Sequence, residues 1–106
     1  MLTRNQTLQI LNISGTMIKN EGTRLLCAGL IAMQHKTLLS LDISDNEITH
    51  TACQALHDLL LDSCLLRLNI AYNKLGLSGA EKLAAALFFS RSKLNYLNLS
   101  ECSITY

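Results

Sequence analysis

The sequence contains no proline or tryptophan, and aromatic residues make up only 5% of its 106 residues. Charged residues are also few, at 16%, and the formal net charge is +1. So small a net charge creates no long-range field that would concentrate a nucleic acid or an anionic membrane. Hydrophobic residues instead supply 49% of the chain, and 23 of them are leucines. This composition excludes a disordered segment and predicts one domain built from a repeated aliphatic unit.

Long hydrophobic runs are missing as well. The longest apolar segments, such as 83–89, are far shorter than the roughly 18 residues of a membrane span, and the first ten residues contain no signal-peptide core. The four cysteines have scattered spacings within periodic apolar segments, at Cys27, Cys53, Cys64 and Cys102. Free cysteine packs as a small hydrophobe, so we expect reduced, structural thiols in an intracellular, cytoplasmic protein.

A fourfold internal repeat carries most of the leucines. Each copy reads L-x-x-L-x-I/L, and the copies begin at Leu8, Leu38, Leu65 and Leu94. Three residues after the last aliphatic position of each copy comes a small or polar residue, at Thr16, Asn46, Asn73 and Cys102. Apolar residues then recur every fourth position, which is the spacing of one helix face. Each unit is therefore predicted to be strand, turn and helix, with Asn20, Thr51 and Ser78 as candidate helix caps.

The repeat resembles the leucine-rich repeat, whose pattern L-x-x-L-x-L-x-x-N/C-x-L all four copies satisfy. The copies start 30, 27 and 29 residues apart, and segments such as 76–87 look like the ribonuclease-inhibitor class. The resemblance implies an α/β fold, a right-handed solenoid shaped as a horseshoe arc, with parallel strands on the concave face and helices on the convex face. One domain should cover 1–106, with repeats at about 8–37, 38–64 and 65–93 and a partial repeat at 94–106.

The ends of the repeat array lack the atypical polar repeats that normally cover a solenoid. Only seven residues precede the first copy, and no helix follows the fourth. We therefore expect a section of a longer solenoid, or open ends that associate with another chain or with a second copy. Phe88 and Phe89 end the last helical segment, where one ring is expected to cover the core and an exposed second ring would be a contact point.

The spacing of the polar residues matches no metal site and no catalytic motif. Cys53 and His57 lie one helical turn apart, but no second pair completes four metal ligands. The segment 42–47 holds three carboxylates without the spacing and central glycine of a calcium loop. Motifs of activated nucleophiles and phosphate-binding loops do not occur either. The sequence therefore predicts no metal, no cofactor and no enzymatic activity.

The positions between the repeated leucines are the candidate binding surface. Strand side chains alternate, so when Leu68 and Ile70 face the core, Arg67 and Asn69 face outward. The same register and its edges select the predicted partner-binding residues Asn12, Asp42, Arg67, Asn69, Tyr72, Tyr96, Asn98 and Glu101. An ordinary solvated sheet surface is the alternative interpretation of any one of them.

Arg67 and Tyr96 are the expected anchors, because arginine and aromatic side chains dominate the energetics of protein interfaces. On neighbouring strands the guanidinium is expected to stack on the phenol ring, with Asp42 holding Arg67 in place. The sequence thus predicts a non-catalytic protein-interaction or scaffolding module that binds another protein, not nucleic acid or membrane, through its concave face. The alternative function is a part of a GTPase-activating or other enzyme-regulating leucine-rich-repeat protein.

Overall fold

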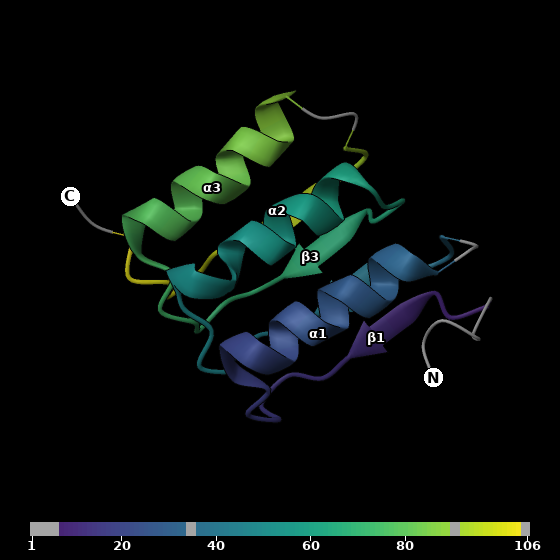
Figure 1. Ribbon diagram of the computed structural model, residues 1–106. Helices are drawn as coiled ribbons and strands as arrows, with labels where there is room; N and C mark the ends of the chain where they lie inside the picture. The colour runs from purple at the N-terminus through teal and green to yellow at the C-terminus, as the bar shows by residue number, and fades with distance from the viewer. Residues whose placement is uncertain (1–6, 34–35, 90–91, 105–106) are drawn as a thin grey trace.

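Short strands and longer helices alternate along the chain and form two layers (Figure 1). The computed structural model describes residues 7–33, 36–89 and 92–104, with the side chain of Phe89 left out. The strand layer consists of β1 (Ile10–Asn12), β2 (Ser40–Asp42), β3 (Arg67–Asn69) and β4 (Tyr96–Asn98). The helix layer consists of α1 (Lys19–Ala32), the 3-10 turn η2 (His50–Ala52), α2 (Cys53–Leu61) and α3 (Gly76–Phe89).

The four strands form one parallel sheet in the order in which they occur along the chain. Leu41 is the register partner of Leu11, Leu68 that of Leu41, and Leu97 that of Leu68. Pairing continues beyond the three-residue strands, since the Ile43 amide donates to the Asn69 carbonyl at 2.9 Å. The predicted leucine register is confirmed: every strand contributes the same motif position to one row.

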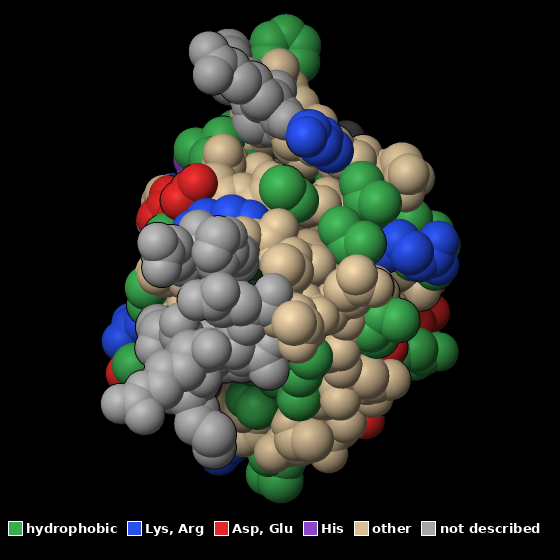
Figure 2. Space-filling model, turned by 90° about the vertical axis from the view of Figure 1, so that its right-hand side faces the viewer, with side chains coloured by type: hydrophobic (Ala, Val, Ile, Leu, Met, Phe, Trp, Pro, Cys, Tyr) green, Lys and Arg blue, Asp and Glu red, His purple; other side chains and the backbone are tan. Residues whose placement is uncertain are grey.

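The hydrophobic core lies between the sheet and the helices and is densest in the second and third repeats. Leu41 and Leu68 are 1% and 0% exposed, and α2 covers them with its buried face of Cys53, Leu56, Leu59 and Leu60. α2 in turn packs between α1 and α3. Leu11 and Leu97, in the outer strands, are only partly buried because each has a neighbouring repeat on one side alone. On the face shown in Figure 2, hydrophobic side chains are interspersed with polar groups.

Two buried asparagines connect successive repeats at the turns that follow the strands. The Asn73 Oδ1 atom accepts from the amides of Asn46 at 2.9 Å and Ile48 at 3.0 Å, while its Nδ2 donates to the Ile43 carbonyl at 3.1 Å. Asn46 makes the same contacts one repeat earlier, where its Oδ1 accepts from the Thr16 amide at 2.9 Å. This confirms the prediction that these side chains satisfy buried main-chain groups between repeats.

The predicted helix caps are wrong. No side-chain cap is present at the start of α1 or α2, and Ser78 lies inside α3. Asn20 instead joins two repeats, because its Nδ2 donates to Thr49 Oγ1 at 2.8 Å and its Oδ1 accepts from the Thr49 amide at 2.9 Å. Thr49 is itself the cap of η2, because its hydroxyl oxygen accepts a hydrogen bond from the Thr51 amide. Contacts to the neighbouring repeat thus take the place of local caps.

Candidate protein-binding surface

The outward positions of the strands form a continuous row of short polar side chains. Asn12 is paired in register with Asp42, Asp42 with Asn69, and Asn69 with Asn98. Asn12 is exposed and the other three are half-buried. The structure therefore brings together four of the predicted contact residues on the strand face, by which we mean the outward side chains of β1 to β4.

Each residue of this row also ends its own strand with a local hydrogen bond, which the sequence reasoning missed. The Oδ1 atoms accept from the amide two residues later, at 3.0, 3.0, 3.1 and 2.9 Å in the four repeats: Asn12 from Ser14, Asp42 from Ser44, Asn69 from Ala71 and Asn98 from Ser100. The signal was an Asn or Asp at one fixed motif position in all four copies. One oxygen of each side chain is thus committed to the turn, and the amide group of Asn69 also donates to Asp42 at 3.4 Å.

Arg67 and Tyr96 stack as expected. They are register partners on β3 and β4, and the guanidinium carbon of Arg67 lies 4.0 Å from the centroid of the Tyr96 ring. At this distance the cation lies within reach of the ring's negative face, and the planar group is held in one orientation. Tyr96 remains 38% exposed, so the pair is accessible from the strand face.

The expected contact between Asp42 and Arg67 is wrong. One oxygen of Asp42 accepts from the Ser44 amide at 3.0 Å and from its hydroxyl at 2.7 Å, and the other accepts from Asn69 Nδ2 at 3.4 Å. The register explains this, because it places Ser40 rather than Asp42 beside Arg67. In the described part of the chain no carboxylate forms an ion pair with Arg67.

In each repeat, one residue of the turn after the strand has a left-handed backbone conformation. It is the residue that directly precedes Thr16, Asn46, Asn73 or Cys102. The φ angles are 64°, 53°, 60° and 55° in the four repeats, at Gly15, Asp45, Tyr72 and Glu101. A residue with a Cβ atom pays roughly 1–2 kcal/mol for this conformation, yet only the first repeat uses glycine here. Tyr72 is 63% exposed at this position, and its amide donates to the Ser100 carbonyl beside Glu101. Tyr72 and Glu101 therefore lie in neighbouring turns at the rim of the strand face.

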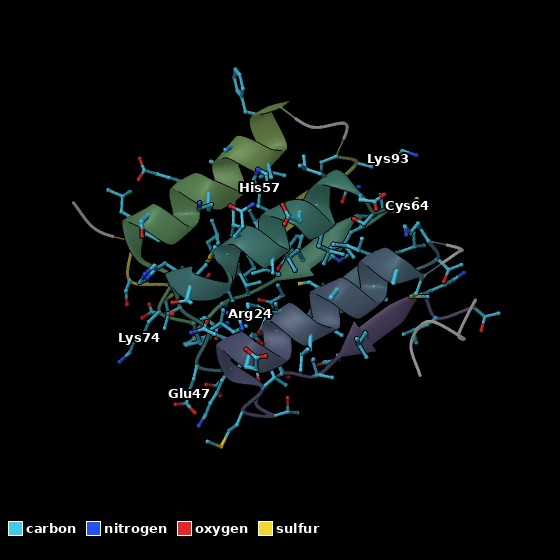
Figure 3. The ribbon with its side chains drawn as sticks, viewed as in Figure 1. Arg24, Glu47, His57, Cys64, Lys74 and Lys93 are labelled. Carbon is cyan, nitrogen blue, oxygen red and sulfur yellow. The ribbon has the colours of Figure 1, made fainter. Side chains whose placement is uncertain are left out.

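A hollow of about 320 Å³ opens at the same rim, and we call it the rim hollow. Its lining comes from the turns after β2 and β3 and consists of Asp45, Glu47, Thr49, Tyr72, Asn73 and Lys74. Figure 3 shows Glu47 and Lys74 extending from the end of the molecule where the helices begin. Of these six residues only Tyr72 was in the predicted site. The others were missed because their side chains meet only once two turns, far apart in the sequence, lie side by side.

Comparison with known proteins identifies the fold. The family model for the leucine-rich repeat matches residues 4–27, 34–56 and 62–84, which is more than half of the chain. The chain belongs to the leucine-rich-repeat family. Its right-handed α/β solenoid is therefore that of the ribonuclease-inhibitor class, with the strands on the concave face.

Similar proteins cover almost all of this leucine-rich-repeat chain. Ribonuclease inhibitor from Sus scrofa is 34% identical over 99% of the chain, which corresponds to 23% of that protein. NACHT, LRR and PYD domains-containing protein 4E from Mus musculus is also 34% identical over 99% of the chain. Protein 7 of the same name from Homo sapiens is 32% identical over the same share. The chain spans about a tenth of the length of these two NACHT proteins.

The thiols of the repeat chain are free and largely buried. Burial raises the pKa of Cys27 to about 12, with a further contribution from the Asp58 carboxylate, and raises the pKa of Cys53 to about 11. The pKa of Cys102 is also raised by burial. Thiolates, the reactive form, are therefore suppressed at these three positions. Within residues 7–33, 36–89 and 92–104, no three His, Cys, Asp or Glu side chains gather around a metal position.

The end of α3 carries an exposed aromatic group. Phe88 is 81% exposed at the end of α3, so it does not cover the core. The side chain of Phe89, the second residue of that prediction, lies outside the described residues. Across the described part of the chain, no helix is both long enough and apolar enough to cross a membrane.

Proposed function

We propose that this leucine-rich-repeat chain binds another protein through its strand face and has no catalytic role of its own. The observation that carries the proposal is the stack of Arg67 on Tyr96, at 4.0 Å, on the two strands β3 and β4 of the accessible strand face. The pig relative is named as an inhibitor of ribonuclease, which is itself a protein, and this supports a role in protein binding. The four free thiols fit an intracellular location.

The Arg67–Tyr96 pair has the chemistry of an anchor for an acidic group. A guanidinium presents several N–H donors in a rigid plane that matches the two oxygens of a carboxylate. Because no described carboxylate pairs with Arg67 and the Tyr96 ring orients it, little side-chain entropy would be lost on binding. The amides of Asn69 and Asn98 lie beside it on the same strands and add hydrogen-bond donors. The partner is therefore expected to present an Asp, a Glu or a terminal carboxylate here.

The proposal is tested by substitution once a partner has been isolated by cross-linking and its affinity measured by calorimetry. Arg67→Ala and Tyr96→Ala are each expected to weaken binding by about thirtyfold or more, as truncated anchors do. Tyr96→Phe keeps the ring and should retain most of the affinity. Arg67→Lys keeps the charge but loses the planar fork, so it should fall between the parent and Arg67→Ala.

Exposed charged residues of the helix face provide the control. Glu81→Ala and Lys82→Ala alter α3, on the opposite layer, and should change the affinity less than about twofold. Circular dichroism must show the parent fold in all variants. If the α3 variants weaken binding more than the strand-face variants, the interface lies on the helices and the proposal is wrong.

A further inference from the structure

The rim hollow has an aromatic wall with carboxylates beside it and lies outside the row of polar side chains on the strand face. Its volume of about 320 Å³ is large enough for a long side chain. The Tyr72 ring is 63% exposed and stands between two turns that carry acidic residues, Asp45 on one side and Glu101 on the other. The hollow is thus an open, preformed cavity rather than a packing defect of the core.

The carboxylates of the rim hollow, Asp45 and Glu47, have no described hydrogen-bond or ion-pair partner for their side chains. Neither Asp45 nor Glu47 forms an ion pair in the described ranges, whereas Glu21 pairs with Arg24 on α1 and Asp58 contacts His57 on α2. No hydrogen bond from a described donor reaches either of these two carboxylates, although Asp42, three residues before Asp45 in the sequence, is engaged with Ser44 and Asn69. Two carboxylates beside an exposed phenol ring favour a cation, by charge attraction and by the negative face of the ring.

We propose that the rim hollow accepts a lysine or arginine side chain of the partner protein. The alkyl part of that side chain would lie along the Tyr72 ring, and the charged end would face the carboxylates of Asp45 and Glu47. The proposal rests on the protein-binding function given above and adds the chemistry of a second contact. The Thr49 hydroxyl lines the same hollow and is already used by Asn20, which holds that wall in place.

Lys74 is the opposing charge in the hollow. Its ammonium group is exposed and pairs with neither carboxylate, so the lining carries two negative charges and one positive charge. Lys74 therefore weakens the attraction for an incoming cation without occupying its place. Two substitutions should therefore change the affinity of the hollow for a cation in opposite directions. Removing the charge of Glu47 should lower this affinity, and removing the charge of Lys74 should raise it.

The two contacts together define a charge pattern on the partner. Arg67 begins β3, and Tyr72 follows three residues after the end of this strand. Since an extended chain rises about 3.3 Å per residue, the two positions are separated by at most about 16 Å. A partner would thus present a carboxylate toward Arg67 and a basic side chain toward the rim hollow within that distance.

The test uses the isolated chain and small probes, so it needs no partner. Nα-acetyl-lysine amide and Nα-acetyl-arginine amide are titrated while amide chemical shifts are followed by NMR, with Nα-acetyl-norleucine amide as the uncharged control. We expect saturable shifts at Thr49, Tyr72 and Lys74 with both cations and none with norleucine. Binding should be weak, in the range of about 10 mM, because exposed ion pairs contribute little each.

Matched variants decide whether the charges act as proposed. Glu47→Gln should weaken binding of the lysine probe by about threefold, and Lys74→Gln should strengthen it by about twofold. Glu81→Gln and Lys82→Gln make the same charge changes on α3 and should have no effect. Equal shifts with norleucine, no saturable shift, or equal affinities for the Glu47→Gln and Lys74→Gln variants would each overturn the proposal. Such a failure would leave the partner affinity of Arg67→Ala as an independent measure of the proposed function.

Discussion

Replacing Asn73 by alanine should strongly destabilise the protein, because this side chain serves buried groups of two repeats. Asn73 is 1% exposed, and its removal takes the acceptor from the amides of Asn46 and Ile48. The Ile43 carbonyl loses its described donor as well. The Ala71 carbonyl retains another partner, since it also accepts from the Asp45 amide. Three buried main-chain groups are therefore left unsatisfied.

An unsatisfied buried polar group costs about 1–3 kcal/mol, so the three together should lower the free energy of unfolding by about 3–9 kcal/mol. This is most of the stability of a small domain, for which about 5–15 kcal/mol is typical. Urea unfolding followed by circular dichroism measures the change. Asn73→Cys should cost less than Asn73→Ala, since Cys102 at the equivalent position donates to the Ile70 carbonyl at 3.2 Å.

Asn46→Ala is the matched control for this reasoning. Its Oδ1 atom serves the amides of Thr16 and Ile18 in the first repeat, where Thr16 is exposed and water can replace the lost acceptor. Its removal should therefore cost at least about 1 kcal/mol less than that of Asn73. If the two alanine variants are equally stable, or if Asn46→Ala is the less stable, burial of the inter-repeat contacts is not what sets their strength.

Three further changes test other parts of the fold. Leu68→Ala, at the centre of the core with 0% exposure, should cost about 2–5 kcal/mol, and a melting temperature within error of the parent would show that the leucine row is not central. Burial raises the pKa of Cys27 and Cys53 above the ordinary value of 9.0, so only the unfolded state loses these protons at first. The free energy of unfolding should therefore be independent of these thiols below pH 9 and should fall by about 1.4 kcal/mol per pH unit for each thiol up to about pH 11. Urea unfolding at several pH values measures this dependence, which should be weaker in Cys27→Ala than in the parent. Tyr72 has a φ angle of 60°, so Tyr72→Gly should remove the strain of its left-handed conformation and raise the free energy of unfolding by about 1 kcal/mol. If urea unfolding shows a lower free energy of unfolding instead, the exposed ring contributes packing.

The sequence predicted the parts of the structure that follow from periodicity. The spacing of Leu41 and Leu68 placed equivalent residues in register, and the alternation of side chains then put Arg67 next to Tyr96 on the strand face. Such inferences succeed because every repeat must bury the same positions against its neighbours. The turn roles of Asn46 and Asn73 followed from the same argument.

Contacts that depend on one particular side-chain conformation could not be predicted in this way. Asp42 is drawn to the Ser44 amide by a local turn, which competes with the more distant guanidinium expected as its partner. Asn20 bonds across to Thr49 instead of capping its own helix, because the adjacent repeat offers both a donor and an acceptor. The rim hollow is lined by two left-handed turn residues, Asp45 and Tyr72, and a tyrosine gives no signal of that backbone conformation.

The contacts of the two buried asparagines, Asn46 and Asn73, run in one direction along the chain. The amides of Thr16 and Ile18 depend on a side chain from the second repeat, and those of Asn46 and Ile48 depend on one from the third. During synthesis, each turn can close only after the following repeat has emerged. In the folded protein, loss of a later repeat exposes the turn before it, whereas fraying of the first repeat removes the Asn20 acceptor of the Thr49 amide but leaves the Asn73 contacts in place. Hydrogen exchange at Thr16 therefore reports the folding of the second repeat rather than of its own.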